Sequence, residues 1–132
     1  MKISRFALLA SIAIGAAVPA HAQVPTFDTA AVSAGCAASA CSAAAQAAIS
    51  QILGSGLTGS AYSAQITLLA SMLYSMAQNG QISGAEAAAA LRTVAANSTD
   101  ATQSAAILAG AANLENGNAG TGTPPSFEAS PN

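Results

Sequence analysis

The sequence predicts an all-α protein, a small alanine-rich bundle of three to four helices over residues 23–114, with a disordered tail at residues 115–132. Alanine supplies much of the 52 % hydrophobic fraction, and it is the best helix former while contributing little to a core. Apolar residues recur at helical spacing between positions 62 and 76. Clusters of glycine, asparagine and serine divide the chain into segments of helix length.

The first two helices are expected over residues 30–53 and 60–78. Asp28 can cap the first helix, Gly35 is a point where it can be disrupted, and residues 54–56 end it. The second helix is expected to be the central element of the core. Its buried stripe, which Leu68 and Met72 widen, consists of Tyr62, Ile66, Leu69, Leu73 and Met76.

The third and fourth helices are expected over residues 84–96 and 100–114. Ser83 and Glu86 form a capping box for the third helix, which buries Leu91 and Val94. The fourth helix is expected to bury Ile107, Leu108, Ala111 and Leu114. The tail that follows is rich in glycine, asparagine, threonine and proline, with Phe127 either as an exposed aromatic or as a docking point.

Residues 1–22 have the order of a cleavable signal peptide. Lys2 and Arg5 form a basic start, residues 6–18 are uncharged and apolar or small, and Ala20 and Ala22 occupy the −3 and −1 positions of a cleavage site. The apolar stretch is too short for a membrane anchor, which needs about 20 residues. The mature chain is therefore expected to be exported without a transmembrane anchor, periplasmic or extracellular, and the pattern suits a bacterial protein.

Composition excludes most catalytic chemistry from the mature chain. Arg92 is its only basic residue beside five acids, and His21 leaves with the signal. Catalytic triads with histidine, histidine metal sites and Schiff bases are then absent. One cation cannot neutralise a nucleic-acid backbone. We therefore expect no enzyme activity, no cofactor and no nucleic-acid partner. Arg92 is expected either as a solvated charge or as the partner of an acid elsewhere in the bundle.

Cys36 and Cys41 are the only cysteines. Five residues apart on an ideal helix, they point about 140° away from each other, so a bridge requires a local turn, which Gly35 and Ser39 can provide. Such a small ring would stabilise the fold by about 2 kcal/mol. Intermolecular pairing and free thiols remain the alternatives, whereas the spacing and the lack of a nearby base disfavour a redox site.

Residues 79–86 resemble the second half of an EF-hand calcium loop. The resemblance implies Asn79, Ser83 and Glu86 as side-chain ligands of calcium. Two earlier ligand positions fall on Ser75 and Ala77, where that family has acids, so the implied site is weak. A turn between two helices with a capping box explains the same residues.

The function that the sequence favours is that of an exported non-enzymatic helical module for interaction or self-assembly. Its expected partner is itself or another exported protein. The alternative is a module that binds a small ligand, or calcium weakly through residues 75–86. An enzyme that uses only carboxylates, such as Glu86 with Asp100, is a third hypothesis.

Overall fold

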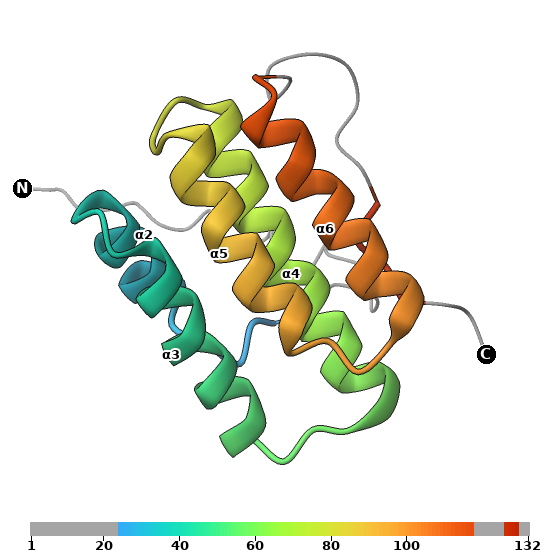
Figure 1. Cartoon of the computed structure of the whole chain (residues 1–132). Coiled ribbons are helices and arrows are strands. Elements are labelled where there is room, and N and C mark those ends of the chain that lie inside the picture. The colour runs from blue at the N-terminus through green and yellow to red at the C-terminus, as the bar shows by residue number, and fades with distance from the viewer. Residues whose placement is uncertain (1–23, 118–125, 130–132) are drawn as a thin grey trace, which may run out of the picture.

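The structure, a computed structural model, describes residues 24–117 and 126–129, and these residues form an all-helical bundle (Figure 1). The predicted fold class is confirmed, but the described residues contain five helices instead of three to four. The predicted signal peptide with Ala20 and Ala22 lies outside the described residues, as does most of the tail. The helices are α2 (Thr29–Ala37), α3 (Cys41–Gly54), α4 (Gly59–Gln78), α5 (Gly84–Ala96) and α6 (Ala101–Glu115).

The additional helix arises because the predicted helix over residues 30–53 is broken at residues 38–40. Ser39 has a φ of 63°, and the amide of Ala40 donates to the carbonyl of Gly35 at 2.8 Å. Helix propensity favours a continuous helix here, but the pairing of Cys36 with Cys41 requires the chain to turn. The predicted helix is therefore interrupted, three to five residues after the disruption considered at Gly35, and the turn reverses the chain so that α2 packs on α3.

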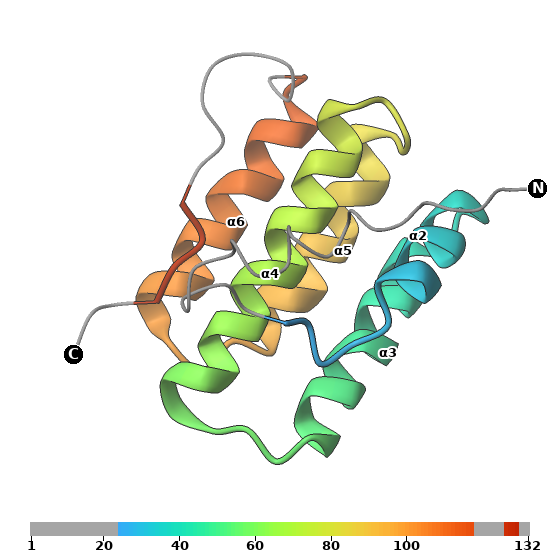
Figure 2. The same cartoon turned by 180° about the vertical axis from the view of Figure 1, so that it is seen from behind.

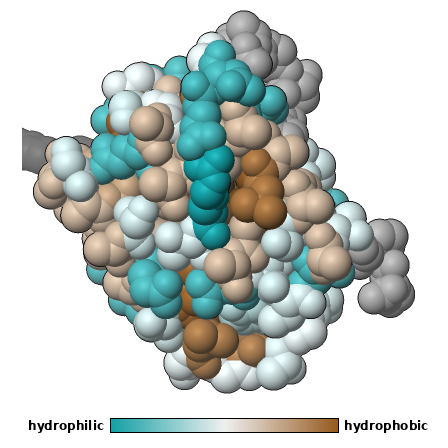
Figure 3. All heavy atoms as spheres, in the orientation of Figure 1, coloured by the Kyte–Doolittle hydropathy of each residue, from teal (hydrophilic) through white to brown (hydrophobic). Residues whose placement is uncertain are grey.

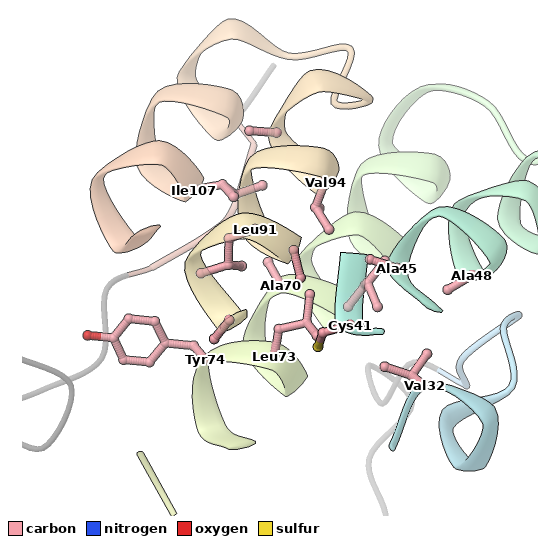
Figure 4. Close-up of a cluster of buried hydrophobic side chains, with 14 of the residues drawn as sticks. Val32, Cys41, Ala45, Ala48, Ala70, Leu73, Tyr74, Leu91, Val94 and Ile107 are labelled. Atoms are coloured by element: carbon pink, nitrogen blue, oxygen red, sulfur yellow. The ribbon is translucent and has the colours of Figure 1, made fainter. Parts of the chain in front are cut away.

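The core lies between α3, α4, α5 and α6, whose side-by-side arrangement is visible from both sides in Figures 1 and 2. All five residues of the stripe predicted for α4 are buried. Figure 4 shows part of this core, to which α4, α5 and α6 contribute Leu73, Leu91 and Ile107 respectively. The larger side chains with less than 2 % of their surface exposed include Ile49, Ile52, Ile66, Leu69, Leu73, Leu91, Ile107, Val32 and Val94.

Helix α4 contacts α3, α5 and α6, as predicted for a central element, and α5 is equally central. Helix α5 contacts α3, α4 and α6, and its contact with α6 is the most extensive between any two helices. Ala87, Ala88 and Ala90 are fully buried on α5. Because alanine is small, the neighbouring backbones can approach closely, and dispersion contacts replace the missing side-chain volume. The alanine-rich composition of α5 thus allows it to lie against three neighbouring helices.

Local signals place most of the helix ends correctly. The side chains of Asp28, Ser83 and Asp100 accept hydrogen bonds from amides in the first turns of α2, α5 and α6. Gly80 ends the turn after α4 with a φ of 76°, a conformation that glycine adopts without strain. These caps satisfy amides that would otherwise lack a partner inside the helix.

The buried face of α6 differs from the predicted one. Ile107, Ala111 and Leu114 are buried as predicted, whereas Leu108 is 45 % exposed. Gln103, which is fully buried, lies on the inner face of the helix. The prediction for Leu108 is wrong because it assumes that the buried face of α6 is entirely apolar. The polar residue Gln103 lies on this face instead.

The predicted disordered tail contains one segment, residues 126–129, that packs against the bundle. Phe127 is 2 % exposed, so the expectation of an exposed aromatic is wrong. Its neighbours at 118–125 and 130–132 lie outside the described residues. Helix α6 also continues to Glu115, the first residue assigned to the tail. Within the described part of the chain, no helix has the length and apolar character needed to cross a membrane.

Candidate functional site

The two cysteines form a disulfide between the end of α2 and the start of α3. Both side chains are buried, with 1 % of their surface exposed. Gly35 lies beside this turn, and a Cβ atom there would come within 2.6 Å of the Cβ of Ala44. The pair is compatible with an oxidising compartment and leaves no free thiol on the chain.

Replacing both Cys36 and Cys41 with serine is expected to lower the free energy of unfolding by about 2 kcal/mol. The ring is small, so the loss of constraint on the unfolded chain is modest. Denaturant unfolding of the wild-type chain and the double variant measures the difference. Reductant should lower the stability of the wild-type chain to that of the variant and leave the variant unchanged. Equal stability of the two chains without reductant would show that the bridge contributes nothing.

The loop that resembles an EF-hand joins α4 to α5. Asn79 caps the C-terminus of α4, and the hydroxyl of Ser83 accepts a hydrogen bond from the amide of Glu86. The Glu86 carboxylate itself accepts a hydrogen bond from the amide of Cys41 at 3.4 Å. The N-terminus of α3 has no cap from its own Ala40, so Glu86 supplies one from another helix. Calcium binding by Asn79, Ser83 and Glu86 stays a prediction.

The acidic residues are dispersed over the described structure. Glu86 lies in the first turn of α5, whereas Asp100 follows its end, and the helix from Glu86 to Ala96 is about 15 Å long at about 1.5 Å per residue. The structure therefore does not bring together the two carboxylates considered for acid–base chemistry. Among the described residues, no three histidine, cysteine, aspartate or glutamate side chains are grouped for a metal ion.

Arg92 on α5 pairs with Glu115 at the end of α6. Its two terminal nitrogens lie 2.5 and 2.6 Å from the two carboxylate oxygens, a bidentate arrangement. The hydrogen bonds from Arg92 lower the pKa of the Glu115 carboxyl below its ordinary value, and the same bonds raise the pKa of Arg92. Both side chains are more than two-fifths exposed, so solvent screens the pair. Of the two predicted roles for Arg92, the structure supports pairing with an acid.

Lowering the pH is expected to decrease the stability of the wild-type chain more than that of a Glu115→Gln variant. Because the folded-state pKa of Glu115 is depressed, its stabilising effect is present above the ordinary pKa of about 4.3 and is lost as the pH falls through the folded value. Melting temperatures of both chains between about pH 7 and pH 2.5 test this. The other acids are common to both chains, so the difference isolates Glu115. Melting temperatures that fall in parallel for the two chains as the pH is lowered would contradict the expectation.

The first described residues, 24–28, pack on α4 through a buried glutamine. The side-chain oxygen of Gln65 accepts a hydrogen bond from the amide of Thr26 at 2.8 Å, and its nitrogen donates to the carbonyl of Val24 at 3.1 Å. Gln65 is 3 % exposed, and Phe27 is buried beside this contact with 6 % of its surface exposed. One side chain thus binds both a donor and an acceptor of the backbone that leads into α2.

Residues 126–129 pack against α4 and α6, and Figure 2 shows them as the red segment beside α6. The carbonyl of Phe127 accepts hydrogen bonds from the side chains of Gln103 at 2.9 Å and Thr67 at 3.0 Å. The ring of Phe127 packs against Tyr74, with ring centroids 5.8 Å apart. Tyr74 is only 3 % exposed, and this segment covers its ring.

Gln103 connects residues 126–129 to the bundle beneath them. Its side-chain nitrogen lies 2.9 Å from the carbonyl of Ser63, the hydroxyl of Thr67 and the carbonyl of Phe127. Its side-chain oxygen accepts a hydrogen bond from Ser98 at 2.8 Å. The groove, which we define by Ser63, Thr67, Tyr74 and Gln103 and call the α4–α6 groove, therefore combines an aromatic contact with buried donors that bind a peptide carbonyl.

Sequence reasoning missed both glutamines. A glutamine in an alanine-rich helix is expected at the surface, because its side chain is polar. For Gln65 a signal was available, because it lies three residues after Tyr62 and four residues before Leu69 of the buried stripe. For Gln103 the available signal was its position four residues before Ile107 on the same helical face.

A small pocket opens at the other end of α4. Its volume is about 200 Å³, below the range of about 300–1,000 Å³ that is typical of ligand sites. The hydroxyl of Tyr62 donates to the carbonyl of Asn97 at 2.7 Å, and burial raises the pKa of this hydroxyl. The pocket suits at most a small apolar group. Its lining consists of Leu53, Leu57, Thr58, Gly59, Tyr62 and Thr99.

Comparison of the chain with protein families, curated proteins and solved structures finds no match. Among the described features, the α4–α6 groove has the most complete recognition geometry, because it binds both a side chain and a backbone carbonyl. We treat this groove as the candidate functional site because it holds a segment of the same chain through one aromatic ring and one carbonyl.

Proposed function

We propose that this chain is an exported, non-enzymatic helical module for interaction or self-assembly, acting in the cell envelope or outside the cell. The observation that carries the proposal is the α4–α6 groove, which holds an extended segment by the Phe127 ring and carbonyl. Many peptide-recognition domains combine hydrogen bonds to the peptide main chain, which give affinity, with a pocket for a peptide side chain, which gives specificity.

The residues available to the mature chain support binding more than catalysis. Arg92 is its sole cation, and the structure engages this residue with Glu115. The surface is correspondingly poor in charge, and such a surface gives little electrostatic repulsion between copies. The disulfide is compatible with function in an oxidising compartment outside the cytoplasm.

A broad apolar interface is not the basis of the proposal. The large hydrophobic residues exposed among those described are Val24, Leu53 and Leu108. Figure 3 shows that hydrophobic residues on the face seen in Figure 1 form small separate patches. Stable interfaces usually bury a larger area with well-packed anchors. Binding of a segment in a groove is therefore the mode that these features favour.

The absolute mass of the chain from Gln23 onward tests the proposal. Light scattering after size exclusion should be recorded from about 10 µM to about 1 mM, with and without reductant. A mass that rises with concentration toward a multiple of one chain supports self-assembly. A single-chain mass in every condition, together with no protein captured from the native envelope extract, would reject the proposal.

A further inference from the structure

The α4–α6 groove contacts Phe127 through residues that are distant from it in the sequence. Thr67 lies 60 residues before Phe127, and Gln103 lies 24 residues before it. The contacts are a buried ring, which is 2 % exposed, and one carbonyl bound by two side chains. None of these contacts depends on the segment belonging to the same chain. An identical segment from a second copy satisfies the same donors and the same aromatic partner.

The connection between α6 and this segment is short. Residues 118–125 join Gly117 to Ser126, so nine peptide units can extend over at most about 30 Å at roughly 3.3 Å per residue. The return path from Glu115 to the level of Gln103 is about 18 Å, at about 1.5 Å per helical residue. The segment can therefore reach its own groove, as it does in this structure, and a shorter connection would prevent this.

We propose that two copies of this chain associate by exchanging residues 126–129 between their α4–α6 grooves. The inference rests on the proposed function and names its partner, a second copy of the chain. Each copy carries both the groove and the segment that fills it, so a reciprocal exchange closes as a symmetric dimer. The partner is a second copy because the segment that fits the groove is a part of this chain.

The concentration of the protein determines which segment fills the groove. A short tether gives a segment an effective concentration in the millimolar range at its own groove. A second copy competes with this only when its concentration approaches the same range. The wild-type chain is accordingly closed and monomeric at micromolar concentrations, and exchanged dimers accumulate toward about 1 mM.

Shortening the connection tests the exchange at low concentration. Deleting residues 118–123 leaves three peptide units between Gly117 and Ser126, which extend to at most about 10 Å and cannot cover the return path. The shortened chain is expected to have twice the mass of one chain at about 20 µM, at least 50-fold below the concentration at which wild type exchanges. A matched control replaces residues 118–123 with six glycine and serine residues and should stay monomeric.

Adding Phe127→Ala to the shortened chain should restore the mass of a single chain, because the exchanged segment loses its anchor. If the shortened chain keeps its helical circular dichroism but is monomeric, the exchange is overturned. If the double mass survives Phe127→Ala, another surface joins the copies; the exchange is then rejected while the proposed function stands. The wild-type mass series tests the proposed function separately.

A complementation experiment avoids the deletion. A full-length Phe127→Ala chain has an intact groove without an anchored segment, and a Gln103→Leu chain has an intact segment with an impaired groove. Each chain alone should be monomeric at about 300 µM, whereas an equimolar mixture should approach the mass of two chains. Circular dichroism verifies that both variants are folded. A mixture that stays monomeric overturns the exchange.

Discussion

A Gly84→Ala substitution is expected to lower the free energy of unfolding by about 3 kcal/mol, although alanine is the better helix former. Gly84 begins α5, and a Cβ atom there would lie 2.5 Å from the carbonyl oxygen of Leu114 on α6. A main-chain oxygen cannot turn aside as a flexible side chain can. The two helices with the most extensive contact in the bundle would have to separate.

Gly54→Ala is the matched control for this expectation. Gly54 ends α3, and a Cβ atom built there meets no atom within 4 Å. Its substitution should change stability by less than about 0.5 kcal/mol or increase it slightly. Denaturant unfolding of the two variants measures the difference, and thermal melting should place Gly84→Ala lower by about 10 °C or more. Equal stability of the two variants would mean that α5 and α6 are farther apart than described.

A Gln103→Leu substitution is expected to cost about 3 kcal/mol, although leucine has a similar size and is more hydrophobic. Gln103 is fully buried, and its nitrogen lies 2.9 Å from the carbonyls of Ser63 and Phe127. Removing this donor leaves buried carbonyls with fewer partners, and a buried acceptor without a hydrogen bond costs about 1–3 kcal/mol. The loss of its bond with Ser98 adds to the effect.

Gln46→Leu on the exposed surface of α3 provides the control, and its effect should stay within about 0.5 kcal/mol. The ring of Phe127 offers a second measurement. In the Gln103→Leu chain, chemical shifts of Tyr74 should move as its aromatic neighbour leaves. A variant as stable as wild type with unchanged Tyr74 shifts would show that Gln103 does not hold the segment.

The parts of the fold that follow from local chemistry could be predicted from the sequence. The stripe of α4 has strict helical spacing, so its register determines which side chains are buried. The caps at Ser83 and Asp100 involve residues only three positions apart, so they depend on no tertiary information. The bounds of α5 agree with prediction to the residue for this reason.

The remainder depends on contacts between distant residues. The turn at Ser39 contradicts helix propensity, and only the pairing of Cys36 with Cys41 explains it. The spacing of the two cysteines showed that a bridge needs a turn, but not whether the bridge forms. The burial of Phe127 depends on a groove formed by two other helices. Periodicity within one segment carries no information about such a groove.

The separation of contacts along the chain has a consequence for the order of folding. The helices close hydrogen bonds over four residues, whereas Thr67 contacts a carbonyl 60 residues later. Closing the longer loop costs more conformational entropy, and topologies with distant contacts form more slowly. Helix α4 should therefore assemble with α5 and α6 before Tyr74 is covered. For that interval the aromatic side chain stays accessible to solvent, so the covering of Tyr74 marks a late step of folding.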